Sequence, residues 1–270
     1  MVLEKNIKEF CAEQKSEIKS YIEASKTAPI LAVIQVGDVE ASNRYIKNKK
    51  KDCEEVGIKF EWYHFNEDIN TEGLVFEIEN LLPHVDGLMV QMPLPEHIDV
   101  NVIKTAISPE KDVDGFHPNS FFRPCTPLGI IDYLTLGCHY ELEGKNVMVI
   151  GRSDIVGKPL ASMLTDLDAT VTLCHSKTRE LYDFIFTADL IICAVGKANF
   201  LNCYSIYKPV IDVGINFDEN GKLVGDCFNT ENRDVTPVPG GVGLLTRVAL
   251  LKNVMLAAKA NKKEWLYGIR

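Results

Sequence analysis

The stretch VMVIGRSDIVGKPLA, residues 147–161, decides the fold of the second half of this chain. Its apolar run ends at Gly151, and a helix is predicted to begin near Gly157, as in the strand, turn and helix of a dinucleotide-binding site. The spacing is G-x-x-x-x-x-G, with Ser153 where the usual fingerprint has its second glycine. The turn alone therefore fits a nucleotide site or a plain strand-to-helix connection.

The segments after this turn predict a parallel sheet. Apolar runs typical of strands alternate with helical patterns, and these strands are ATVTLC (169–174), ADLIICAVG (188–196) and PVIDVGI (209–215). Helices are predicted at 157–167 and 178–186, and a long one at 244–261. This order indicates a Rossmann-like, doubly wound α/β domain.

The first half of the chain shows the same alternation. Strands are predicted at 30–37, 58–65 and 87–95, with helices at 41–57 and 71–82 between them. The turn-rich segment 108–129 then interrupts the pattern, as a domain junction or a functional loop does. We therefore expect two α/β domains, residues 1–120 and residues 121–246.

Composition narrows the classes of function. The 270 residues are 46% hydrophobic and 25% charged, which is typical of a globular protein. The formal net charge of −9 argues against general binding to nucleic acid or to an anionic membrane, which select basic surfaces. We expect small-molecule partners.

The chain also lacks the sequence signals of export. Its first residues, MVLEKNIKEFCAEQKSEIK, carry a charge every few positions, and no later stretch reaches about 18 uncharged apolar residues. None of the eight cysteines forms a C-x-x-C pair, and Cys174 and Cys193 lie in apolar runs. We expect a cytoplasmic protein with free thiols and no metal site.

The stretch SNRYIKNKKKD, residues 42–52, contains a candidate catalytic lysine. On a helix, Ser42, Tyr45 and Lys49 fall within about 60° of one another, so their side chains can enter one pocket. A run of lysines is more often simply a solvated helix end, and that is the default interpretation of this segment alone. The spacing permits catalysis without requiring it.

The end of the strand 169–174 bears on the choice of cofactor. An NAD enzyme would place an acid near this point to bind the ribose hydroxyl, but the chain continues CHSKT, residues 174–178. Ser176 and its neighbours offer donors and no carboxylate, and Arg152 is available to join them. This combination favours the 2′-phosphate of NADP over NAD.

Two other motifs leave alternatives open. DVDGFHP, residues 112–118, holds Asp112 and Asp114, a pair that fits a metal site, a general-acid pair or a capped turn. PVPGGVG, residues 237–243, suits close approach of backbone to a flat ligand, and it equally suits a plain loop before the last helix.

Taken together, the motifs resemble the bifunctional methylenetetrahydrofolate dehydrogenase/cyclohydrolase family. The resemblance spans nearly the whole chain and rests on eight ordered motifs: S-x-x-Y-x-x-x-K (42–49), VQMPLP (90–95), KDVDGFHP (111–118), PCTP-x-G (124–129), GRSDIVGKP (151–159), ATVTLCHSKT (169–178), DVGIN (212–216) and TPVPGGVG (236–243). It implies a homodimeric enzyme of one-carbon metabolism that uses NADP and tetrahydrofolate one-carbon derivatives. It also implies that the last helix returns to the first domain, so that residues 247–270 complete it.

The resemblance also implies roles for individual residues. Lys49 would be the catalytic amine, Tyr45 would stack on the folate, Gln91 would hold Lys49, and Asp114 would bind the pterin ring. The remaining folate-site residues would be Val90, Met92, Pro237, Pro239, Gly240 and Gly241. The cofactor would be lined by Gly151, Arg152, Ser153, Ser176 and Ile215.

The chain departs from the family pattern in three places. Leu244 replaces a proline in GGVGPMT, HPNSFF replaces the commoner HP-x-N-x-G, and the segment before DVGIN is short. Two other functions fit the same folds: a monofunctional dehydrogenase and a catalytically silent nucleotide-binding protein. The intact Lys49 argues against both.

Overall fold

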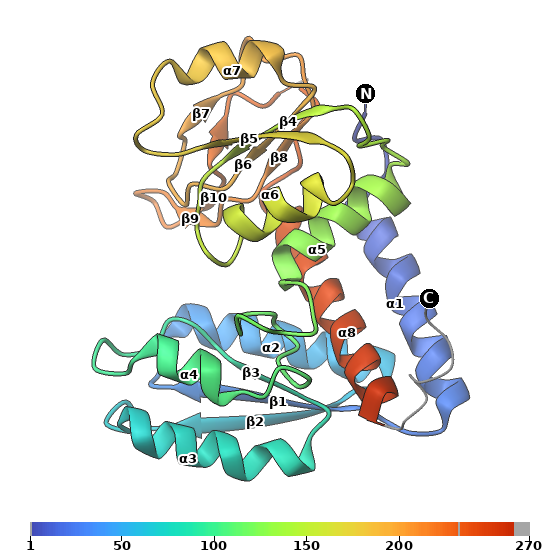
Figure 1. Ribbon diagram of the computed structural model, residues 1–270, viewed down its shortest axis with the longest axis vertical. Coiled ribbons are helices and arrows are strands. Elements are labelled where there is room, and N and C mark those ends of the chain that lie inside the picture. Colours follow the sequence, from blue (N-terminus) through green and yellow to red (C-terminus); the bar gives the residue numbers. More distant parts are fainter. Residues whose placement is uncertain (1, 232, 262–270) are drawn as a thin grey trace. The chain divides into compact units, whose positions relative to one another are not determined.

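The computed structural model describes residues 2–231 and 233–261 (Figure 1). The chain divides into two compact units. The first unit holds Glu13–Cys125 and the chain from Arg247 onward, and the second unit holds the residues up to Ala12 and Thr126–Thr246. These bounds differ from the domains predicted by sequence at residues 1–12, which group with the second unit, and at 121–125, which group with the first.

A three-stranded parallel sheet forms the centre of the first unit. Its strands are β1 (Ile30–Val36), β2 (Lys59–Phe65) and β3 (Gly87–Val90), in the order β2-β1-β3. Every residue of β1 after Ile30 is buried, because a central parallel strand is covered on both faces. The predicted third strand, 87–95, was too long, and β3 ends before the prolines that follow.

Helices cover both faces of this sheet. They are α2 (Glu40–Val56), α3 (Thr71–Leu81), the 3₁₀ turn η1 (Leu82–His84) and α4 (Val100–Ala106). Helix α1 (Ile7–Ser25) belongs to the first unit only from Glu13 onward. Apolar residues of α3 and α4 share one core with Ala32 and Ile34 of β1, and α2 lies on the opposite face (Figure 1). At the end of α2, Gly57 takes φ +87°, and Ile58 N–H donates to Cys53 O, as in a Schellman cap.

The second unit contains a four-stranded parallel sheet. Its strands are β4 (Asn146–Ile150), β5 (Thr170–Cys174), β6 (Leu190–Cys193) and β8 (Val210–Asp212), in the order β5-β4-β6-β8. Figure 1 shows α6 (Gly157–Thr165) and α7 (Leu181–Thr187) on opposite faces. The predicted class, two α/β units with a Rossmann-like second one, is confirmed.

The other elements of the second unit are short, apart from the last helix. They are α5 (Cys125–Asp132), the π-helical turn η2 (Tyr133–Gly137), and the strand pairs β7 (Leu201–Asn202) with β11 (Cys227–Phe228) and β9 (Asn216–Phe217) with β10 (Leu223–Val224). Helix α8 (Val242–Asn261) begins in the second unit and continues in the first. Within the described ranges, no helix has both the length and the apolar character to cross a membrane.

Two buried carboxylates organise the carboxyl ends of β6 and β8. Asp226 is fully buried and accepts hydrogen bonds from the backbone N–H groups of three successive residues, 195–197, at 2.7, 2.9 and 2.9 Å. It also accepts from the Asn216 side chain at 2.9 Å. Asp212 accepts from the N–H groups of Gly214, Asp226 and Cys227. Backbone dipoles therefore replace water around both charges.

Changing Asp226 to asparagine tests this arrangement. The amide turns one of the two acceptor oxygens into a donor that faces other donors, and a buried unmet donor costs about 1–3 kcal/mol. We expect Asp226→Asn to lower the free energy of unfolding by about 2–3 kcal/mol in urea titrations. The control is Asp218→Asn in the half-exposed turn before β10, with an expected effect within about 0.5 kcal/mol. Equal losses in the two variants would contradict the account.

Candidate active site

One face of α2 turns a lysine inward. Ser42 is buried, and Tyr45 and Lys49 are half-buried on the same face, as their helical spacing predicts. Lys50 and Lys51 are exposed, so they form the solvated face of the helix. Lys49 is therefore partly buried in the first unit, while Lys50 and Lys51, its neighbours in the basic run, face solvent.

The Lys49 amine is held by the end of β3. Its Nζ donates to Gln91 Oε1 at 2.8 Å and lies 3.5 Å from the sulfur of Met89. Gln91 Nε2 in turn donates to the Met92 carbonyl at 2.8 Å, which fixes the orientation of the amide. Val90 is buried at the end of the strand. The structure thus brings Lys49, Gln91, Val90 and Met92 together.

Burial governs the protonation of this site. Removal from water lowers the pKa of Lys49, the charge of Asp114 opposes this shift, and Arg247 adds only a smaller lowering. Burial likewise raises the pKa of Asp114, against the influence of Lys49. Both groups are therefore displaced toward their neutral forms. Burial also raises the pKa of the Tyr45 hydroxyl.

The loop after α4 separates the roles of its two aspartates. Asp112 is buried and caps the loop, because its carboxylate accepts from His117 N–H at 2.7 Å and its carbonyl accepts from the Ser120 hydroxyl at 3.1 Å. Asp114 is close enough to Lys49 for each charge to influence the pKa of the other group. The capped-turn interpretation is therefore correct for Asp112. Ser120 belongs to the altered HPNSFF segment and stabilises this loop.

A buried asparagine of α8 fixes the same loop, and sequence reasoning missed it. Asn253 Nδ2 donates to the carbonyls of Val113 at 2.9 Å and Arg123 at 3.1 Å. The Cys125 thiol also donates to Val113 O at 3.3 Å. These bonds hold the backbone on both sides of Asp114. Nothing in the local sequence of α8 signals this contact.

A second group that the sequence did not reveal lies one helical turn beyond Lys49. Asp52 is buried and accepts from Lys15 Nζ at 2.5 Å. Its other oxygen, Oδ2, lies 2.8 Å from Arg247 Nη1 as an ion pair, without the alignment of a hydrogen bond. Although burial alone lowers the pKa of Lys15, its bonds to Asp52 and Glu55 raise it overall.

In the second unit, the carboxyl ends of β4 and β5 bring several predicted cofactor residues together. Ile150 pairs with Cys174, and Gly151 N–H donates to Cys174 O at 2.9 Å, so Arg152 and Ser176 follow adjacent strands. Both side chains are exposed, as donors to a ligand need to be. The turn after β5, residues 175–178, contains no carboxylate.

The glycines of this turn are required by close packing of the protein's own backbone. Gly151 has φ +120°, and a Cβ there would lie 2.0 Å from Ala194 O. A Cβ on Gly157 would lie 2.0 Å from Gly151 O. Ser153 is exposed, and its hydroxyl accepts from Val156 N–H at 3.3 Å at the start of α6. The turn, the helix start and the exposed donors fit a dinucleotide that carries an additional phosphate.

Ile215 is placed differently from the other cofactor candidates. It follows β8, is 44% exposed, and its Cδ1 lies 3.8 Å from the position of a Cβ on Gly243. The structure therefore brings Ile215 near the start of α8.

The segment PVPGGVG forms the turn before α8. Pro237 and Pro239 are exposed, and Gly240 has φ +98°. A Cβ on Gly241 would lie 2.2 Å from Pro237 O, so the turn requires glycine there. Leu244 N–H donates to Gly241 O at 2.9 Å, a bond that the proline usual in the family could not make.

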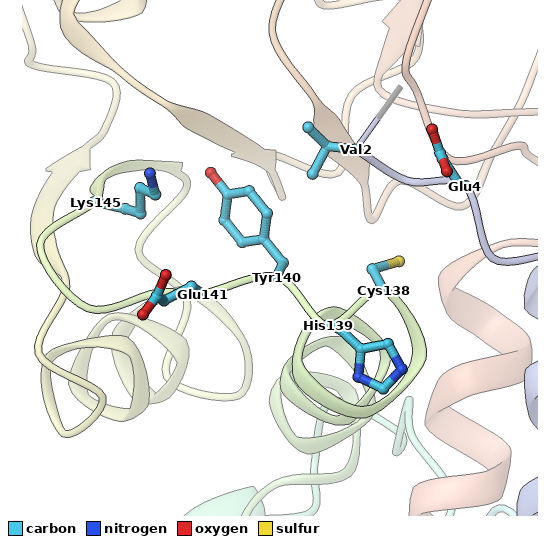
Figure 2. Close-up of a pocket in the computed structure, with 7 residues that line it drawn as sticks. All are labelled: Val2, Glu4, Cys138, His139, Tyr140, Glu141 and Lys145. Atoms are coloured by element: carbon cyan, nitrogen blue, oxygen red, sulfur yellow. The ribbon is translucent and has the colours of Figure 1, made fainter.

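A surface hollow in the second unit lies apart from these groups (Figure 2). Its lining residues are Val2, Glu4, Cys138, His139, Tyr140, Glu141 and Lys145. None of the residues that the family resemblance singles out belongs to this lining. Among the residues that the structure describes, no cluster of three or more His, Cys, Asp or Glu side chains could hold a metal ion.

The fold and these groups define a class of protein: an α/β enzyme with a dinucleotide-type turn in one unit and a buried lysine in the other. Family models make the assignment specific. Residues 3–114 match the catalytic domain of tetrahydrofolate dehydrogenase/cyclohydrolase, and residues 124–262 match its NAD(P)-binding domain. The chain belongs to the tetrahydrofolate dehydrogenase/cyclohydrolase family.

Individual relatives agree with this assignment. The chain is 46% identical to the bifunctional protein FolD of Brevibacillus brevis over 254 residues, which cover 87% of this chain and 89% of that protein. The crystal structure of the bifunctional FolD dehydrogenase/cyclohydrolase from Campylobacter jejuni matches with a TM-score of 0.89 at 42% identity, over 95% of this chain and 98% of that one. The Trypanosoma brucei enzyme, solved with NADP and an inhibitor, matches with a TM-score of 0.84 at 32% identity, over 95% and 96%.

Proposed function

We propose that this chain catalyses both reactions of its family. It oxidises 5,10-methylenetetrahydrofolate to 5,10-methenyltetrahydrofolate with NADP, and it then hydrolyses the methenyl compound to 10-formyltetrahydrofolate. The observation that carries the proposal is the buried Lys49 amine, which donates to Gln91 and has a lowered pKa. A neutral amine next to a bound folate is the group that hydrolysis requires.

Lys49 acts as the general base in hydrolysis. The oxygen of a water molecule forms a bond to the methenyl carbon, and one proton of that water passes to Nζ. The bond from this carbon to the pterin-side nitrogen then breaks with its electron pair left on that nitrogen. The added hydroxyl becomes the formyl oxygen, the proton that it loses is taken up at that nitrogen, and the formyl group stays on the other nitrogen. An ammonium ion cannot accept a proton, so Lys49 has to enter the step neutral. Burial and the positive charge of the methenyl substrate both favour that form.

Gln91 and Tyr45 position the reacting groups. Gln91 orients the amine through a neutral amide, which adds no negative charge that would raise the pKa of Lys49. Tyr45 lies one turn before Lys49 on the same face of α2, where its ring can stack on the flat folate. Val90 and Met92 flank Gln91. We assign Pro237, Pro239, Gly240 and Gly241 to the folate site on the family resemblance.

Asp114 binds the pterin ring. The ring's amino group and adjacent N–H form a pair of donors that one carboxylate can accept. The loop around Asp114 is held by Asn253, so the carboxylate is fixed before substrate arrives.

NADP supplies the hydride acceptor for the first reaction. Gly151, Ser153 and Ile215 line the cofactor, and Arg152 and Ser176 bind its 2′-phosphate. The absence of a carboxylate in the turn 175–178 supports NADP over NAD. A monofunctional dehydrogenase and a silent nucleotide-binding protein are the rival functions, and separate assays of dehydrogenation and methenyl hydrolysis distinguish all three.

We also propose that the enzyme is a cytoplasmic homodimer. The second unit exposes several large aromatic side chains, including Phe186 at 88% and Tyr207 at 80%, and exposed aromatic residues favour protein contacts. Light scattering on the purified chain gives the oligomeric state. Small polar substrates and the net charge of −9 suit a cytoplasmic enzyme.

Replacing Lys49 tests the base. We expect Lys49→Met to lower the rate of methenyl hydrolysis by at least about a hundredfold, because no other group takes the proton. NADP affinity should stay unchanged, since the cofactor residues lie in the second unit. Lys50→Met is the matched control, because Lys50 is exposed on the same helix, and it should keep the wild-type rate. Hydrolysis by Lys49→Met at the wild-type rate would refute the role.

Replacing Asp114 tests the folate site. Asp114→Ala leaves the pterin donors without a partner, which costs about 1–3 kcal/mol for each buried group. We expect folate binding and both activities to fall at least tenfold, with unchanged binding of NADP measured by fluorescence titration. Normal folate affinity in this variant would show that Asp114 does not bind the pterin ring and contributes only to the structure of the loop.

Replacing Arg152 tests the preference for NADP. A charge-assisted contact to the 2′-phosphate is lost in Arg152→Ala, so the KM for NADP should rise about tenfold or more. The KM for NAD should change little, because NAD lacks that phosphate. Steady-state dehydrogenase assays with each cofactor measure both values. An equal rise in the KM for NAD and for NADP would refute the assignment of Arg152 to the 2′-phosphate.

A further inference from the structure

The loop after β6 is built around the buried carboxylate of Asp226. The backbone N–H groups of Val195, Gly196 and Lys197 converge on it at 2.7, 2.9 and 2.9 Å. Asp226 is fully buried, whereas Gly196 and Lys197 are exposed, so the carboxylate holds the loop from its inner side. Successive N–H groups that converge in this way form a concavity that binds an anion. Here the protein's own carboxylate fills that concavity.

This pairing fixes the direction of two backbone carbonyls. The peptide bonds of the loop are trans, and in a planar trans peptide the C=O points opposite to the N–H. Because the N–H groups of Gly196 and Lys197 point to Asp226, the carbonyls of Val195 and Gly196 point away from it. No residue in the described part of the chain donates a hydrogen bond to either carbonyl. The loop therefore presents two acceptors on its outer side.

These acceptors lie beside the turn that is assigned to the cofactor. Ala194 N–H donates to Ile150 O at 2.8 Å, and a Cβ on Gly151 would lie 2.0 Å from Ala194 O, so the loop and the turn touch. In the sheet order β5-β4-β6-β8, the chain leaves β4 for β5 on one side and returns to β6 on the other. Ligands of such sheets bind at the carboxyl ends of the strands, at this reversal. The loop 195–197 occupies that position.

The order of the strands also indicates which half of NADP the loop meets. Ser176, which is assigned to the 2′-phosphate, follows β5 at one edge of the sheet, whereas Ile215 follows β8 at the other edge. A dinucleotide whose 2′-phosphate lies at β5 extends its nicotinamide half past β4 toward β6 and β8. The hydroxyl groups of the ribose in that half are donors that suit backbone carbonyls.

Asp226 also fixes the segment that contains Ile215. Asn216 Nδ2 donates to Asp226 Oδ1 at 2.9 Å, and a Cβ on Gly214 would lie 2.4 Å from the same oxygen. Asp212 supports the arrangement, because its Oδ1 accepts from the N–H groups of Gly214 and Asp226 at 2.9 Å each. One buried carboxylate thus holds the loop after β6 and the segment after β8 together.

We propose that Asp226 is a positioning residue for the nicotinamide half of NADP. It keeps the carbonyls of Val195 and Gly196 turned outward, where they accept hydrogen bonds from the hydroxyl groups of the nicotinamide-side ribose. The inference rests on the proposed use of NADP and adds a residue that acts through the loop without touching the cofactor. Because the carboxylate fills the anion-binding side of the loop, the other side recognises an uncharged sugar.

Two ligands separate the halves of the site: NADPH contains both halves, and adenosine 2′,5′-bisphosphate contains only the 2′-phosphate half. In Asp226→Asn, the amide NH₂ faces at least one loop N–H in either orientation, so the loop loses its fixed direction. We expect the Kd for NADPH to rise about tenfold, as for the loss of two neutral hydrogen bonds. The Kd for the bisphosphate should change by less than about twofold. Calorimetric titration of the full-length chain measures both.

Two variants control for other effects of the substitution. Asp218→Asn makes the same change of charge in the half-exposed turn before β10. Leu142→Ala truncates a buried side chain that precedes β4, at the opposite end of that strand from Gly151, and so destabilises the same unit. Both variants should keep the wild-type Kd for each ligand at temperatures where they are folded.

Amide hydrogen exchange tests the loop without any substitution. In NMR spectra of the labelled wild-type chain, the amides of Val195, Gly196 and Lys197 should be protected before cofactor is added, because their acceptor is buried. Exchange of these three amides at the rate of unprotected amides would show that Asp226 does not hold the loop, and it would overturn the inference.

The binding data decide the inference separately from the proposed function. An unchanged Kd for NADPH in Asp226→Asn would overturn the inference, as would an equal loss of affinity for the two ligands or an equal loss in Leu142→Ala. Failure of the wild-type chain to bind NADPH would overturn both the inference and the proposed function. NADPH binding without dehydrogenation or methenyl hydrolysis would refute the proposed function alone, and the contrast between the two ligands would still decide the role of Asp226.

Discussion

Removal of the Lys49 amine from water is the constraint on which the rest of the first unit depends. A lysine in water has a pKa near 10.4 and would be almost fully charged at neutral pH. Burial lowers that pKa, but it also leaves an amine that needs a partner. Gln91 meets the need as a neutral acceptor, and its own amide is fixed on the Met92 carbonyl. This arrangement therefore depends on the position of the end of β3, which places Gln91 next to the Lys49 amine.

The two units stabilise their buried carboxylates in different ways. In the second unit, Asp226 is surrounded by backbone N–H groups and an amide, so the charge is satisfied without a cation. In the first unit, Asp52 is paired with two cations, Lys15 and Arg247. The first arrangement fixes loop geometry at the carboxyl ends of strands. The second joins residues of α1, α2 and α8.

Sequence periodicity predicted the features that depend on a single helix or strand. It did not predict the features that depend on contacts between distant parts of the chain. The spacing of Tyr45 and Lys49 on one helix face allowed both to enter one pocket, but the family resemblance, not the spacing, favoured that interpretation. The alternation of elements indicated two parallel sheets. The roles of Asp112 and Asp114 could not be separated, because the difference depends on where the His117 N–H lies. Arg247 and Asn253 left no signal, since their partners are distant in the sequence and only the tertiary fold brings them together.

The central claim is that burial lowers the pKa of the Lys49 amine and so favours the neutral form that can act as a base. Its titration can be followed directly by NMR of isotope-labelled lysine side chains in the wild-type enzyme, with the resonance assigned by its loss in Lys49→Met. The account predicts that the Lys49 resonance titrates with a midpoint below the ordinary lysine value of about 10.4. A Lys49 midpoint at or above the ordinary value would contradict the account.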